Sequence, residues 1–152
     1  MEQAESVSGG STHSLDRPMN VFTYGSLMFP EVWERVVRGA YSHAAAAAAG
    51  FRCYAVQGET YPGMVAAESA ASAPDRVEGV VYFDVSLEDL AALDSFEGGD
   101  YRRVEIAASL PDGTSVNASA YLYLPQEKLA PEPWSRDNFQ LKSFLRSYWG
   151  LP

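Results

Sequence analysis

The chain has 152 residues, of which 47% are hydrophobic, and its formal net charge is −9. This length allows one domain with a substantial core, and this hydrophobic content excludes a disordered chain. The acidic balance argues against nucleic acid and anionic lipid as partners, because both select for an excess of Lys and Arg.

The sequence contains few targeting or redox signals. No apolar run approaches the ~20 residues of a membrane span, and the N-terminus lacks a basic region followed by an apolar one. The single cysteine, Cys53, excludes an intrachain disulfide, lacks a metal-ligand partner at suitable spacing, and is expected in the core. These features predict a cytoplasmic protein with no membrane contact.

The first predicted element is a strand over residues 20–24, which contains the β-forming run Val-Phe-Thr. Residues 1–18 are polar and small, so we expect a flexible tail followed by a single domain over 19–152. A short helix is expected over 30–38, because its apolar residues share one face and Gly39 follows it.

The turn between this strand and this helix is the first candidate site. Gly25 breaks the strand, Ser26 can turn the chain, and Pro30 suits the first turn of a helix. Such a turn leaves several backbone N–H groups unpaired and pointing one way, which attracts an anion or a developing oxyanion. The alternative is an ordinary connection between a strand and a helix.

Residues 44–49 are six consecutive alanines. Intrinsic propensity favours a helix there, but the run is short, and Gly50 and a strand-like segment over 51–56 follow it. Both structures are therefore considered at this position. His43, which precedes the run, is expected on the surface.

The rest of the chain alternates β-like segments with turn signals. Ser86 is predicted to cap a helix in a capping box with Asp89, with a buried face of Leu87, Leu90, Leu93 and Phe96. The remaining elements are strands over 61–65, 77–85, 101–109 and 115–124, loops over 70–76 and 125–133, and a last helix that Ser135 caps and Gly150 ends. The predicted class is α+β, a small and strongly twisted sheet or barrel with flanking helices.

Glu97 is the second candidate site. It ends the helix that Ser86 begins, and Phe96 precedes it. The negative end of the helix dipole and burial beside Phe96 would both raise the pKa of this carboxyl and make it a better base. The alternative is a solvated surface glutamate, and Asp94 and Asp100 are expected to face solvent or cap.

Other catalytic patterns are not found in the sequence. With only two histidines, one of them in the tail, a Ser/His/Asp arrangement is not credible. No phosphate-binding loop or dinucleotide fingerprint is present, and neither a metal nor a cofactor is expected.

The chain resembles the γ-glutamylcyclotransferase-like family, also called AIG2-like, in four motifs that occur in the family's order. They are YGSLM at residue 24, YPG at 61, VEG at 77 and LDSFEGGDYRR at 93. The likeness covers about residues 20–124. It implies a small mixed β-barrel with helices, and a strand for the alanine run.

The same resemblance implies roles for individual residues and a reaction. Glu97 matches the catalytic glutamate, and the backbone of the loop Tyr24, Gly25, Ser26 and Leu27 would bind the γ-glutamyl group. Tyr101 and Tyr121 fall where the family places site tyrosines, and Tyr61 lies near the cavity in such a layout. The implied reaction releases a free amine from a small-molecule γ-glutamyl amide and forms 5-oxoproline.

That reaction suits the residues present. The substrate's own α-amine attacks its γ-carbonyl, so the enzyme needs a proton carrier rather than a nucleophile. A non-catalytic protein that binds a small acid, and a purely structural module, are the alternatives. The sequence leaves the departing amine and the oligomeric state open.

Overall fold

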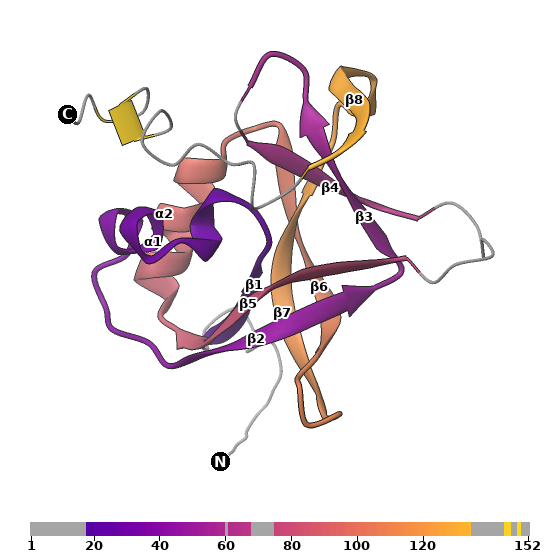
Figure 1. The fold of residues 1–152 in the computed structure, drawn as a ribbon. Coiled ribbons are helices and arrows are strands. Elements are labelled where there is room, and N and C mark those ends of the chain that lie inside the picture. The colour runs from indigo at the N-terminus through magenta and orange to yellow at the C-terminus, as the bar shows by residue number, and fades with distance from the viewer. Residues whose placement is uncertain (1–17, 60, 68–74, 135–144, 147–148, 150–152) are drawn as a thin grey trace, which may run out of the picture.

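The computed structural model describes residues 18–59, 61–67, 75–134, 145–146 and 149. The predicted tail, apart from Pro18, and most of the predicted last helix lie outside these residues. The helices and strands follow one another in this order (Figure 1): β1 Met19–Thr23, η2 Ser26–Met28, α1 Pro30–Val36, β2 His43–Ala49, β3 Phe51–Val56, β4 Pro62–Ala66, β5 Arg76–Val85, α2 Leu87–Glu97, β6 Tyr101–Ser109, β7 Ser115–Tyr123, η3 Gln126–Lys128 and β8 Leu129–Pro133.

The strands form a closed barrel and a separate small sheet. The barrel order is β1-β5-β2-β6-β7, and the parallel pairing of Val21 with Ser119 closes β1 onto β7. The small sheet has the order β4-β3-β8. In Figure 1, α1 and α2 lie together on one side of the barrel, and the small sheet lies on the other. The predicted α+β barrel with flanking helices is therefore confirmed.

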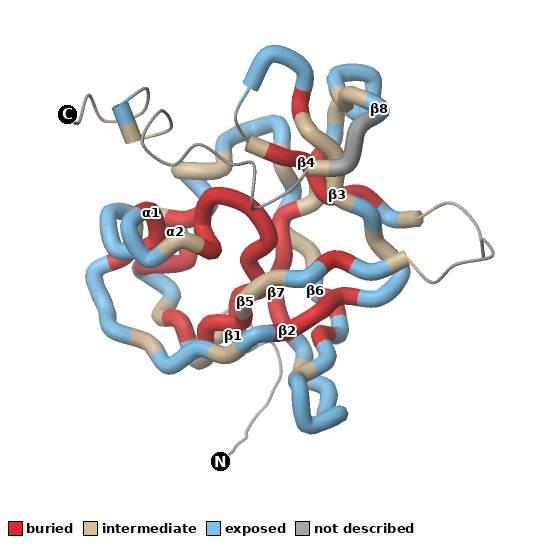
Figure 2. Tube along the Cα trace, in the orientation of Figure 1, coloured by how far each residue is buried: buried red, intermediate tan, exposed pale blue. Residues whose placement is uncertain are grey.

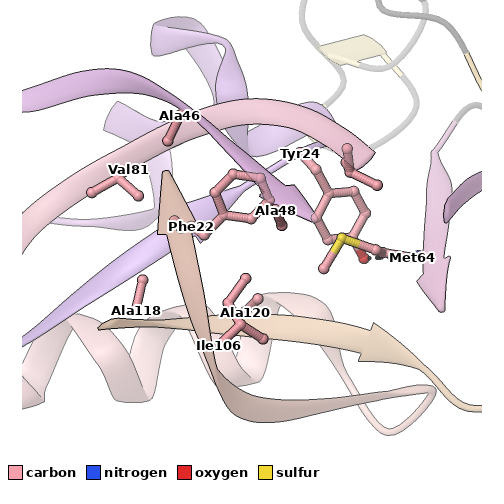
Figure 3. Close-up of a cluster of buried hydrophobic side chains, with 11 residues drawn as sticks. Phe22, Tyr24, Ala46, Ala48, Met64, Val81, Ile106, Ala118 and Ala120 are labelled. Atoms are coloured by element: carbon pink, nitrogen blue, oxygen red, sulfur yellow. Dashed lines mark hydrogen bonds between the residues drawn. The ribbon is translucent and has the colours of Figure 1, made fainter. Parts of the chain in front are cut away.

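The barrel interior explains the alanine run. Ala46 and Ala48 lie two apart on β2, so both point to the same side of the strand. They join a buried cluster with Phe22 and with a second such pair on β7, Ala118 and Ala120. Figure 3 shows these small side chains gathered around Phe22. Small residues fit the narrow space inside a five-stranded barrel, so strand structure prevails over helix propensity here.

A second buried cluster joins the helices to the outside of the barrel. Trp33 of α1 stacks on Tyr82 of β5 with 3.7 Å between ring centroids, and Leu90 and Leu93 of α2 are buried beside them. Leu87 is 42% exposed, so its predicted place on this face is wrong. It is the first residue of α2. Figure 2 shows burial along the strands and helix faces, and exposure at the β6–β7 turn.

The start of α2 confirms half of the predicted capping box. The Ser86 hydroxyl accepts a hydrogen bond from the Asp89 N–H, at 3.2 Å. The Asp89 carboxylate does not return to Ser86. It is buried and accepts from the Arg38 and Gly39 N–H groups and from the Tyr41 hydroxyl. Asp89 therefore fixes the chain after α1 against α2.

Two further expectations need correction or refinement. Residues 125–133 are not a loop throughout, because η3 is followed by β8, which pairs with β3 at Tyr54 and Val56. Cys53 is half-buried at the edge of the barrel cluster, where burial raises the pKa of its thiol to about 12. His43 is exposed, as predicted. Within the described part of the chain, no helix has the length and apolar character needed to cross a membrane.

Candidate active site

A cavity of about 360 Å³ opens where the end of β1, the end of α2 and the start of β4 meet. Every residue that the sequence predicted as a site residue lines it: Tyr24, Gly25, Ser26, Leu27, Tyr61, Glu97, Tyr101 and Tyr121. These residues are up to 97 positions apart in the chain, and the fold places them around one space. Their part in binding or catalysis remains a prediction.

The wall also contains residues that the sequence reading did not single out for the site. Phe22 and Thr23 come from β1, Pro62 from β4, and Phe96 from α2, while Gly98, Gly99 and Asp100 form the turn after α2. In the sequence, most of them adjoin Glu97 or the end of the first strand, and Pro62 belongs to the YPG motif. The charged groups among the described lining residues are both acidic, Glu97 and Asp100.

The turn at Gly25 has the geometry of an anion cradle. The Met28 N–H donates to the Gly25 carbonyl at 3.0 Å, and the Phe29 N–H donates to the Ser26 carbonyl at 3.1 Å, which winds the chain into η2. Among the described residues, nothing accepts a hydrogen bond from the N–H groups of Gly25, Ser26 or Leu27. These donors border the cavity, where a ligand can accept from them.

Gly25 is required by close packing. A Cβ atom there would lie 2.8 Å from Cγ of Pro62, which is closer than carbon atoms approach. The turn and the start of β4 can therefore meet only at a glycine. This contact sets the position of the free N–H groups relative to the small sheet.

Glu97 is the last residue of α2 and is half-buried in the cavity wall. Burial, and secondarily the negative charge of Asp94, raise the pKa of its carboxyl from 4.5 to about 8. A group with this pKa can both accept and donate a proton near neutral pH. The structure thus places an acid–base group in the same cavity as the turn of free N–H donors.

The tyrosine hydroxyls of the cavity are engaged with the protein. Tyr24 donates to the Tyr121 carbonyl at 2.6 Å and accepts from the Met64 N–H at 3.2 Å. Tyr101 donates to the Pro62 carbonyl at 2.7 Å. Burial raises the pKa of Tyr24, Tyr101 and Tyr121 above 10, so all three stay neutral in the physiological range. They form part of the cavity wall and do not ionise in that range.

The sequence predicts that Asp94 faces solvent or caps, but in the structure its carboxylate is a hydrogen-bond acceptor for two side chains. Its Oδ1 accepts from the Tyr121 hydroxyl at 2.7 Å and from Nε of Arg103 at 2.9 Å. A second nitrogen of Arg103 lies 3.3 Å from Oδ2. Asp94 thereby connects the last turn of α2, which also carries Glu97, to β6 and β7.

The described residues hold no cluster of three or more His, Cys, Asp or Glu side chains suited to a metal ion. The cavity does contain the carboxyl of Glu97 and the turn from Gly25 to Leu27. A half-buried carboxyl can move a proton, and free backbone amides in the same cavity can stabilise an anion or an oxyanion.

A family model described as gamma-glutamyl cyclotransferase, AIG2-like, matches residues 21–139. The chain belongs to this family. It is 28% identical over 121 residues to AIG2-like protein D of Arabidopsis thaliana, a match that spans 80% of this chain and 76% of the relative. AIG2-like protein A of the same plant is 29% identical over 122 residues, or 80% of this chain and 70% of the relative.

Solved structures show the same fold. An Arabidopsis thaliana protein known from a solution structure superposes with a TM-score of 0.63 at 26% identity, over 86% of this chain and 87% of its own. A protein described as a gamma-glutamyl cyclotransferase superposes with a TM-score of 0.62 at 21% identity, over 88% of this chain and 81% of its own. At that identity the second likeness shows the fold alone.

Proposed function

We propose that this protein is a γ-glutamyl cyclotransferase, which converts a γ-glutamyl amide into 5-oxoproline and a free amine or amino acid. The observation that carries the proposal is the position of Glu97, whose carboxyl lines the same cavity as the free N–H groups of Gly25 to Leu27. The family description, which names this activity, supports it. A cytoplasmic setting is part of the proposal.

The chemistry needs one proton carrier. The substrate's α-ammonium loses a proton to the Glu97 carboxylate, and the resulting amine attacks the γ-carbonyl to form the ring C–N bond. The C–N bond to the departing amine then breaks as that nitrogen takes the proton back from Glu97. The ring nitrogen loses its second proton through the same carboxylate to the departing amine, which leaves as an ammonium. The atoms balance with no water consumed and no covalent enzyme intermediate, which fits a cavity whose conspicuous reactive group is a carboxyl.

The raised pKa of Glu97 suits this transfer. A carboxylate with the ordinary pKa of 4.5 would be too weak a base for an ammonium group, at a cost of ~1.4 kcal/mol for each pKa unit of mismatch. With a pKa of about 8, Glu97 exchanges the proton with an amine almost without penalty. Burial in the cavity wall is therefore the physical basis of its proposed role.

The turn from Gly25 to Leu27 supplies the binding half of the site in this proposal. Its N–H groups would hold either the substrate's α-carboxylate or the oxyanion that develops on the γ-carbonyl oxygen. In both cases the substrate is held in the folded conformation that ring closure requires. Such orientation contributes ~7–11 kcal/mol in well-aligned intramolecular reactions.

A panel of γ-glutamyl amino acids and γ-glutamyl amines, assayed in ¹⁸O-labelled water, tests this proposal. Cyclisation predicts equal amounts of 5-oxoproline and free amine, with no ¹⁸O in the 5-oxoproline formed. Release of ¹⁸O-labelled glutamate would instead mean hydrolysis. Bound ligand with no turnover across the panel would support a small-molecule-binding protein and contradict the enzyme.

A further inference from the structure

The hydrogen bonds around Asp94 form a connected unit next to Glu97. Asp94 and Glu97 are three residues apart on α2, so they lie on neighbouring positions of one helix face. Tyr121, which lines the cavity, donates its hydroxyl to Asp94 from β7. Arg103 reaches Asp94 from β6 with two nitrogens, and its third approaches the Met19 sulfur of β1 at 3.6 Å. Three barrel strands thus converge on the helix turn that carries Glu97.

We propose that Asp94 is a positioning residue for Glu97, held by Arg103 and Tyr121, and that the Asp94–Arg103 ion pair sets the electrostatic field in which Glu97 exchanges its proton. Asp94 fixes the last turn of α2 to the barrel and places a negative charge beside the carboxyl. Arg103 partly cancels that charge. The proposal deepens the proposed function, since it assigns a supporting role for the same reaction.

Most of the other titratable groups near Glu97 are neutral tyrosines, so the charges of Asp94 and Arg103 can affect the pKa of Glu97. The other titratable groups that border the cavity are Tyr24 just after β1, Tyr61, Tyr101 of β6, Tyr121 of β7 and Asp100 of the turn after α2. Burial keeps Tyr24, Tyr101 and Tyr121 neutral near pH 8. The charge of Asp94 contributes to the raised pKa of Glu97, second to burial.

The two members of the pair should therefore act on Glu97 in opposite directions. Without the negative charge of Asp94, Arg103 remains as a lone cation and stabilises the ionised Glu97. Without Arg103, the charge of Asp94 is uncompensated and disfavours ionisation of Glu97. Since the Asp94 side chain is 44% exposed, solvent and salt screen both effects, and we expect shifts of about half a pKa unit.

A carboxyl-carbon NMR titration at low ionic strength tests the proposal on the free protein. Glutamate is labelled with ¹³C, and the Glu97 signal is identified by its loss in Glu97→Gln. Asp94→Asn should lower the pKa of Glu97 and Arg103→Gln should raise it. Arg103→Lys, which keeps the charge, should leave the pKa close to that of the wild type.

Opposite signs separate an electrostatic role from a merely structural one. A loosened helix end would expose Glu97 to water in either variant and lower its pKa in both. A fall in both variants, or no shift in either, would overturn the proposal. Glu88→Gln on α2 and Arg102→Gln on β6 remove the same charges outside the cavity and are the matched controls.

Turnover provides a second readout. The pH at which kcat/KM rises should shift in the same direction as the pKa of Glu97 measured by NMR in each variant. At pH 7 the rate should change about threefold. If the wild type forms no 5-oxoproline at any pH, the proposed function fails, while the NMR shifts still decide the role of Asp94. The two failures are therefore distinguishable.

Discussion

Glu97 shows how position alone can raise the pKa of an ordinary side chain. A glutamate in water ionises near pH 4.5, but at the end of α2 this one is half-buried and lies near a second carboxylate, which together raise its pKa to about 8. Nothing in its chemical identity differs from that of Glu88, which is exposed in the first turn of the same helix. The raised pKa of Glu97 arises from its place in the cavity wall.

The raised pKa predicts a pH-dependent stability. The unfolded chain releases the Glu97 proton near pH 4.5 and the folded chain releases it near pH 8, so between these values the folded state binds more protons. The free energy of unfolding contributed by Glu97 is thus present below pH 4.5 and is lost as the pH rises to about 8. Glu97→Gln cannot ionise and does not lose this contribution. The free energy of unfolding of the variant minus that of the wild type should therefore be greater at pH 9 than at pH 5, by roughly 2–4 kcal/mol.

Urea unfolding at pH 5 and pH 9 measures this difference. Glu88→Gln makes the same chemical change on the exposed part of α2, and its effect on stability should be the same at both pH values. A Glu97→Gln variant whose advantage does not grow with pH would show that the carboxyl is not desolvated.

The sequence identified Glu97 but not its support. A glutamate after Phe96 at a helix end is visible in the sequence, and so are the N–H groups of a Gly-Ser turn. The partners of Asp94 are 9 and 27 residues away on two different strands. Arg103 shares the motif at residue 93 with Asp94, but the motif does not show that their side chains meet. Strand pairing alone brings them to α2.

At the scale of the elements, the cavity depends on how the small sheet joins the barrel. The Tyr24 hydroxyl, just beyond β1, bridges the carbonyl of Tyr121 on β7 and the N–H of Met64 on β4. The Tyr101 hydroxyl of β6 adds a bond to the Pro62 carbonyl. Figure 3 shows Tyr24 beside Met64 at the edge of the barrel cluster. These bonds hold the start of β4 close to the turn at Gly25, and both border the cavity.

Tyr24→Phe tests this connection. The substitution keeps the ring but leaves the Met64 N–H and the Tyr121 carbonyl without their buried partner, so the free energy of unfolding should fall by about 2 kcal/mol. Chemical denaturation measures it. Tyr54→Phe removes a hydroxyl that takes part in an exposed bond to Arg52, and it should change stability by less than about 0.5 kcal/mol. Equal effects in the two variants would contradict the bridging role.

Local propensity and tertiary structure disagree in two elements. The six alanines would form a helix by propensity, and only the narrow barrel interior, where Ala46 and Ala48 meet small residues of β7, explains the strand. Residues 125–133 contain prolines and were predicted as a loop, yet β8 pairs with β3. Because β8 is an edge strand of its sheet, proline is tolerated there.

At the scale of the whole molecule, the described barrel, α2 and the small sheet all contribute to the cavity, whose walls come from distant parts of the chain. The fold class was predictable, because turn signals and β-forming segments mark most strands and the motif order resembles one family. The closure of β1 onto β7, and the joint contribution of β4 and α2 to the cavity, were not. Both depend on contacts between residues far apart in sequence.

The central claim is that Glu97 carries the proton while a bound γ-glutamyl group cyclises. The most direct measurement is the rate of 5-oxoproline formation by Glu97→Gln with the best substrate of the panel, with substrate affinity measured separately by calorimetry. We predict a fall in kcat of about 10²–10⁴-fold with substrate still bound. A variant that forms 5-oxoproline at the wild-type rate would contradict the claim.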